Sequence, residues 1–212
     1  MPESLPRRLP RGRHALPPDE VARVQRGRLS LAMAEVMAEK GYAATSVEDV
    51  LKRAKVSRQS FYTLFDSKIS CFMATFEFAG DMLIEHVLGA LTESVPAERS
   101  TPLERYEHAV EVYLKALEAE WPFTRLFLVE VYAAGPQAIS RRRELQQVMA
   151  AAIADMLGVT TESGRLTCSM IVAATSALVT APVAENDREA LRAVGPALVD
   201  HARDLINGGL LD

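Results

Sequence analysis

Four polar side chains of types that bond to nucleobases lie close together in the N-terminal third of the chain. They are Arg58, Gln59, Ser60 and Thr63, directly after Ser57. An Arg can donate two parallel hydrogen bonds to guanine, a Gln can pair bidentately with adenine, and a Thr methyl can contact the thymine methyl. Because any solvated helix face carries similar groups, these side chains indicate DNA recognition only if the surrounding elements present them to a groove.

Residues 46–65 predict two short helices joined by a tight turn, an arrangement that presents such a face. A capping box from Thr45 to Glu48 predicts the start of the first helix. Lys55-Val56 is predicted to form the turn, and Ser57 to cap the second helix. The apolar residues of the second helix, Phe61, Leu64 and Phe65, would pack inward and leave the polar ones outside. The stretch is therefore predicted to be a helix-turn-helix.

The sequence of residues 41–68, GYAATSVEDVLKRAKVSRQSFYTLFDSK, resembles the DNA-binding signature of the TetR/AcrR family of transcriptional regulators. The resemblance covers roughly residues 24–84 and departs from the family at two places. Lys55 stands where the family usually has Gly, and a left-handed turn there would cost Lys about 1 kcal/mol more than Gly. Thr63 and Leu64 stand where aromatic or His residues are frequent. The matching positions are Gly41-Tyr42, Thr45, Asp49-Val50, Val56-Ser57, Phe61-Tyr62, Phe65 and Ser67-Lys68.

The resemblance implies a role for each polar residue of this unit. Thr45, Ser57, Tyr62 and Lys68 would hold phosphates, with Lys68 in the first turn of the next helix, where backbone N–H groups also favour an anion. Arg58, Gln59, Ser60 and Thr63 would face bases of double-stranded operator DNA. For Tyr62, partial packing is the alternative. The family's common mode implies a ligand-responsive repressor that acts as a homodimer.

The rest of the chain predicts helices throughout, so the fold class is all-α with nine helices. The period-two alternation of strands is absent from the sequence, whereas apolar spacing of helical type recurs along it. We expect three parts: a flexible basic arm over residues 1–18, a three-helix DNA-binding head over 19–84, and a ligand-binding and dimerisation bundle over 85–212. The sixth predicted helix runs from Phe123 to Ala134, where Gly135 ends it.

Residues that could line a small-molecule pocket occur in this second half. Aromatic residues at helical spacing are more often core than pocket, so this set stays a hypothesis. Glu130 is more informative, because a carboxylate in an apolar run needs a partner; an internal pair with Arg105 or Arg125 is favoured over a cationic or hydroxylated ligand. The candidates are Tyr106, Tyr113, Trp121, Phe123, Phe127, Glu130 and Met170.

The last two predicted helices, residues 163–183 and 187–207, are candidates for pairing two copies. The first is rich in small residues that allow close approach, and the second has an apolar stripe of Leu191, Val194, Leu198, Ala202 and Leu205. Four such helices, two from each chain, would form a symmetric bundle. The alternative is an ordinary intramolecular core.

Charge is distributed unevenly, which supports a polyanionic partner for the N-terminal third. Residues 1–70 hold 13 Lys and Arg against 8 Asp and Glu, while the whole chain carries a net charge of −4. Residues 168–184 lack charge but are too short and polar for a membrane span. Arg141–Arg143 is interpreted as a solvated face. Cys71 and Cys168 are interpreted as reduced, buried thiols of a cytoplasmic protein.

The sequence offers little support for other functions. Phosphate loops, nucleophile elbows, paired catalytic carboxylates and metal-ligand spacings are not evident, so an enzyme, a cofactor and a metal are not expected. A helical small-molecule carrier or scaffold with a non-functional helix-turn-helix is the alternative. A salt-dependent, sequence-selective DNA complex would separate the two.

Overall fold

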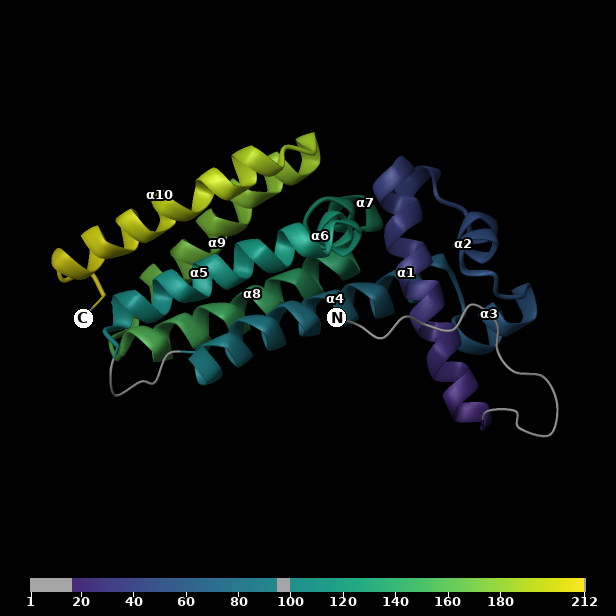
Figure 1. Cartoon of the computed structure of the whole chain (residues 1–212), viewed down its shortest axis with the longest axis horizontal. Coiled ribbons are helices and arrows are strands. Elements are labelled where there is room, and N and C mark those ends of the chain that lie inside the picture. Colours follow the sequence, from purple (N-terminus) through teal and green to yellow (C-terminus); the bar gives the residue numbers. More distant parts are fainter. Residues whose placement is uncertain (1–16, 95–99, 212) are drawn as a thin grey trace.

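The structure, a computed structural model, describes residues 17–94 and 100–211. These residues form helices connected by short loops, and the predicted all-α class is confirmed. Helices α1, α2 and α3 form a head at one end of an elongated molecule, and α4 runs from the head into a helical body (Figure 1). The predicted arm lies almost entirely outside the described residues.

The head consists of α1 (Pro18–Ala44), α2 (Val47–Ala54) and α3 (Arg58–Leu64). Gly41 interrupts α1 with φ 78°, and one further turn follows it, so the predicted stop is a break followed by a short extension. Lys55 adopts the left-handed conformation that the tight turn was predicted to require, with φ 54°.

The start of α2 differs from the predicted capping box by one residue. Ser46 caps the helix by accepting from the Asp49 backbone N–H, and the Asp49 side chain accepts from the Ser46 N–H in return. The predicted pair of Thr45 and Glu48 is therefore wrong. Thr45 is unavailable because its hydroxyl donates to the Gly41 carbonyl at 2.7 Å.

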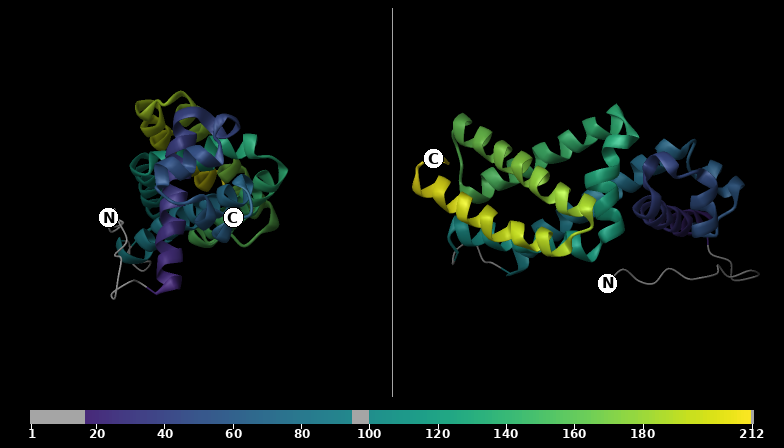
Figure 2. Two further views of the ribbon diagram at one scale, coloured as in Figure 1. Left: turned by 90° about the vertical axis from the view of Figure 1, so that its right-hand side faces the viewer. Right: turned by 90° about the horizontal axis from the view of Figure 1, so that it is seen from above.

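The body contains the long helices α4 (Lys68–Ser94), α5 (Pro102–Ala119), α8 (Pro136–Leu157), α9 (Glu162–Glu185) and α10 (Arg188–Asn207). Figure 1 and the right-hand view of Figure 2 show these helices running roughly along the long axis of the molecule. Thr101 and Glu104 form the predicted capping box of α5. The expected domain boundary after residue 84 lies inside α4, which is continuous there, so this division stays a prediction.

The helix predicted over Phe123–Ala134 is three pieces. They are α6 (Trp121–Arg125), a π-helical turn (Leu126–Glu130) and α7 (Val131–Ala134). Leu126 packs into the core that the head shares with α4, whereas Leu128 packs into a second core with α9 and α10. The wider turn thus directs successive buried residues to two different cores, and π turns of this kind are frequently found at functional sites.

Candidate nucleic-acid interface and effector cavity

Helix α3 presents the polar face that the sequence predicted. Arg58, Gln59 and Thr63 are exposed and Ser60 is half-buried, while Phe61 on the opposite side is fully buried. Ser57 caps the helix by accepting from the Ser60 N–H at 3.0 Å, as predicted. The Thr63 hydroxyl donates to the Gln59 carbonyl at 3.0 Å. The face is therefore open to a groove; the base contacts themselves stay predictions.

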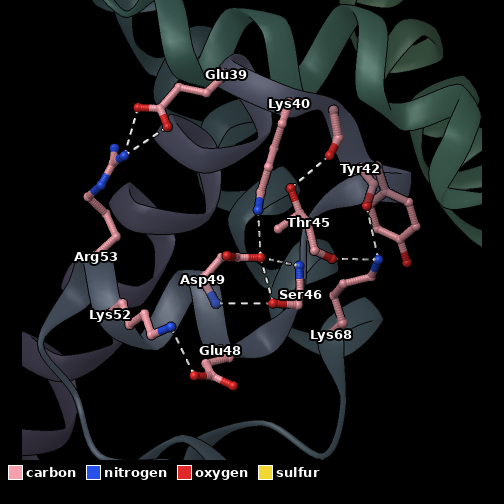
Figure 3. A network of polar contacts seen from close by, with 11 residues as sticks. Glu39, Lys40, Tyr42, Thr45, Ser46, Glu48, Asp49, Lys52, Arg53 and Lys68 are labelled. Atoms are coloured by element: carbon pink, nitrogen blue, oxygen red, sulfur yellow. Dashed lines mark hydrogen bonds and ion pairs between the residues drawn. The ribbon is translucent and has the colours of Figure 1, made fainter.

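Ion pairs and hydrogen bonds fix α2, and with it α3, against α1 (Figure 3). Lys40 Nζ lies 2.7 Å from Asp49 Oδ2, and the same oxygen accepts from the Ser46 N–H at 2.8 Å. The Lys40 ammonium and the Ser46 donors hold the pKa of Asp49 well below its usual range. Arg53 donates to both Glu35 and Glu39 on α1. These contacts set the angle at which α3 projects from the head.

Two residues predicted to hold phosphates are engaged inside the head. Thr45 is 2% exposed, and its backbone N–H bonds to Tyr42. Its hydroxyl and its N–H both have internal partners, so neither is free for a phosphate in this conformation, and the phosphate contact of Thr45 stays a prediction. Lys68 Nζ donates to the carbonyls of Tyr42 at 2.9 Å and Thr45 at 3.0 Å.

Lys68 therefore closes the C-terminal end of α1. Its ammonium lies 4.1 Å from the centre of the Tyr42 ring, and burial lowers its pKa. A lysine has three N–H donors, so one remains for a phosphate, and that contact stays a prediction. Ser57 is exposed, and the ring of Tyr62 is 48% exposed while its edge meets Phe61. Both interpretations of Tyr62 thus remain open.

Glu130 holds the break in α1. The side chain is 7% exposed, and Oε2 accepts from the Tyr42 backbone N–H at 2.7 Å. The interruption at Gly41 explains this partner, because a buried N–H that has lost its helical acceptor needs another one. The predicted pair with Arg105 or Arg125 is wrong: both guanidinium groups bond to backbone carbonyls elsewhere.

An apolar cavity of about 100 Å³ lies in the body, between α4, α5, α8 and α9. Of the predicted pocket residues, Tyr106, Tyr113 and Phe127 line it. Phe123 instead borders a separate cavity of about 270 Å³ beside α6. The π turn reaches the cavity through Leu128.

The other predicted pocket residues do not line this cavity, and their ligand roles stay predictions. Trp121 is buried, and its indole N–H donates to Asn186 Oδ1 at 2.8 Å. Met170 is 63% exposed on the outer side of α9. Glu130 faces the head through its bond to Tyr42. The sequence could not distinguish these residues from the cavity-lining Tyr106 and Tyr113, because both sets recur at the same helical spacing.

The cavity contains one residue that the sequence interpretation missed. Arg142 is 5% exposed, so interpreting it as part of a solvated face is wrong. It donates to the Leu128 carbonyl at 2.8 Å and to Ser176 Oγ at 2.6 Å. The usable signal was its place between Ala138 and Leu145, which are also buried at i−4 and i+3 on α8.

Comparison with known proteins matches residues 31–75 to the family of bacterial regulatory proteins described as the tetR family. This segment spans the end of α1, all of α2 and α3, and the start of α4. Residues 31–75 of this chain are therefore of the TetR type. The chain is 28% identical over 142 residues to the HTH-type transcriptional activator FasR of Mycolicibacterium smegmatis, a match covering 67% of this chain and 61% of that relative.

Solved structures of other bacterial regulators share the fold. The fatty acid degradation regulator FadR of Bacillus halodurans has a TM-score of 0.70 and 18% identity, covering 83% of this chain and 93% of that one. PfmR of Thermus thermophilus, a TetR family regulator, has a TM-score of 0.62 and 20% identity, covering 82% and 97%. FadR of Bacillus subtilis, solved with stearoyl-CoA, has a TM-score of 0.63 and 17% identity, covering 82% and 95%.

The outer face of α9 in this chain is apolar and uncovered. Leu166, Met170 and Leu178 are exposed along one side, separated by small residues. By length and composition, α9 is long and apolar enough to cross a membrane. Of its most apolar 18-residue stretch, 28% is buried inside this chain. The α10 stripe proposed for pairing instead packs into its own chain, with Leu191 and Leu198 in two internal cores.

Among the described residues, no group of three or more His, Cys, Asp and Glu side chains could hold a metal ion. Cys71 and Cys168 are both buried as free thiols, as interpreted from their surroundings. Burial raises the pKa of Cys71 to about 12, so this thiol stays protonated and unreactive near neutral pH.

Proposed function

We propose that this chain is a sequence-specific DNA-binding regulator of the TetR family that acts as a homodimer and responds to a small molecule. The observation that carries the proposal is the exposed polar face of α3, held by the ion pairs between α1 and α2. Arg58, Gln59, Ser60 and Thr63 read bases in the major groove. Ser57, Tyr62 and Lys68 contact phosphates and set the register.

Two heads are needed to read a palindromic operator, and α9 supplies the surface that joins them. Its uncharged outer face buries itself against the same face of a second copy, with the outer side of α10 alongside. The two recognition helices then enter successive major grooves about 34–36 Å apart. The protein is cytoplasmic in this account, where its DNA target lies.

The effector occupies the body and changes the angle of the head through the π turn. Arg142 at the cavity bonds to the carbonyl of Leu128 in the middle of this turn, and Glu130 at the end of the turn bonds to Tyr42 in the head. A ligand that shifts this turn therefore alters the spacing of the two heads, provided it binds the shifted state more tightly. In this account the ligand releases the operator and the protein is a repressor, although the relative FasR is named an activator.

Selection of genomic fragments bound by the purified protein, repeated at two salt concentrations, tests the proposal. The expected result is a palindromic site upstream of a few genes, with weaker binding at the higher salt. A promoter fusion to one such gene then shows whether deletion of the regulator raises transcription, as repression requires. Sequence-blind binding, or no binding either with or without the candidate effectors, would instead favour a helical carrier with a non-functional helix-turn-helix.

A further inference from the structure

Arg142 is a buried cation in a cavity that is otherwise uncharged. Among the described lining residues it is the one with a charged side chain, and the rest are aliphatic, aromatic or neutral polar. It contacts the Leu128 carbonyl, the hydroxyls of Ser176 and Thr180, and the ring of Tyr132, whose centre lies 5.0 Å away. None of the ion pairs found in the described part of the chain includes Arg142.

Burying a charge without a counter-charge is costly, and Arg residues are seldom this buried unless they are paired. Neutral oxygens satisfy the guanidinium hydrogen bonds but leave its positive charge uncompensated. Three acids on the elements around it have other partners: Glu130 bonds to Tyr42, while Glu77 and Glu144 pair with Arg141. Loss of hydration therefore lowers the pKa of Arg142, which is the effect a bound anion would offset.

We propose that the effector is an amphipathic carboxylate whose anionic group binds Arg142 and whose tail fills the cavity. This inference rests on the proposed function and specifies the ligand of the same site. A guanidinium presents parallel N–H donors that match a carboxylate in a bidentate pair. Ser176 and Thr175 supply further hydroxyls beside it, and the aliphatic residues Leu83, Val87 and Ile153 line the path for a tail.

Three probes that share a ten-carbon chain measure the contribution of the ligand's negative charge to binding. They are decanoate, methyl decanoate and decan-1-ol, each titrated calorimetrically into the full-length protein without DNA. The wild type is expected to bind decanoate at least tenfold more tightly than either neutral probe. Arg142→Met removes that preference, while Arg143→Met, an exposed neighbour on α8, keeps it. Thermal unfolding and circular dichroism establish that each variant is folded.

Ser176→Ala keeps the guanidinium and provides a second measurement if Arg142→Met does not fold; it is expected to weaken decanoate more than decan-1-ol. Equal affinity of the wild type for charged and neutral probes, or no decanoate binding, would overturn the proposal. So would tighter binding of decanoyl coenzyme A that Arg142→Met leaves unchanged. Operator binding is measured separately, so a failed carboxylate site and a failed regulator give different results.

Discussion

At the residue scale, the contact between Glu130 and Tyr42 joins parts of the chain that are 88 residues apart. The carboxylate serves a backbone donor that the break at Gly41 leaves without a helical acceptor. It therefore connects head and body and lies outside the cavity that Arg142 lines. An acceptor oxygen in this place is a structural requirement of the broken helix.

Replacing Glu130 with Ala should lower the free energy of unfolding by about 1–3 kcal/mol, because the buried Tyr42 N–H loses its acceptor. Glu130→Gln keeps a carbonyl oxygen at the same position and should lose less. Urea denaturation of the two variants and the wild type measures both values. An Ala variant as stable as the wild type would show that this bond contributes nothing.

Gly41 is required by backbone geometry as well as by space. Its φ of 78° lies in the left-handed region, and a Cβ there would lie 3.4 Å from Glu130 Oε2. Gly41→Ala should therefore cost about 1–2 kcal/mol of stability. Gly89→Ala in α4, where a Cβ meets nothing within 4 Å, is the matched control and should be neutral or slightly stabilising. Equal effects of the two changes in urea denaturation would contradict this assignment.

At the element scale, features set by neighbouring residues were predictable from the sequence. Ser57 caps α3, Thr101 and Glu104 cap α5, and Lys55 takes the left-handed turn position, all as expected. Each depends on hydrogen bonds or sterics within a few residues. The head's type, its apolar side and its polar side followed from the same local information.

Features that depend on distant contacts were not predictable in this way. The sequence of residues 123–134 did not predict a π turn. That turn directs side chains into two cores that are formed largely by other helices. Arg142 lies in a run of three arginines, and its burial depends on contacts with α9 and the π turn, which are distant in the sequence. The α10 stripe has the same spacing whether it pairs with α5 of its own chain or with a second copy.

At the scale of the whole molecule, α9 leaves an apolar face that a soluble monomer would expose. Leu166, Met170 and Leu178 point outward along it, without charged neighbours between them. Exposed apolar surface of this continuity marks an interaction site. Because both copies would use the same face, the contact is a two-fold symmetric one.

Met170→Glu should convert the dimer into a monomer, since it places a charge at the centre of that face where it cannot be solvated. Val148→Glu on the exposed side of α8 makes the same change away from the proposed contact and should leave the dimer intact. Sedimentation equilibrium distinguishes the outcomes, and circular dichroism establishes that both variants are folded. A dimeric Met170→Glu variant would place the pairing surface elsewhere.

The most direct test of the account is the affinity of Arg58→Ala for a recovered operator, measured against single-base variants of that site. If α3 reads bases, the change weakens operator binding about tenfold or more, consistent with 1–3 kcal/mol for a bidentate contact, and relaxes the preference at one base pair. Arg143→Ala removes the same charge from the body and should leave both unchanged. Arg58→Ala binding with undiminished affinity and selectivity would contradict the assignment of α3 as the reading helix.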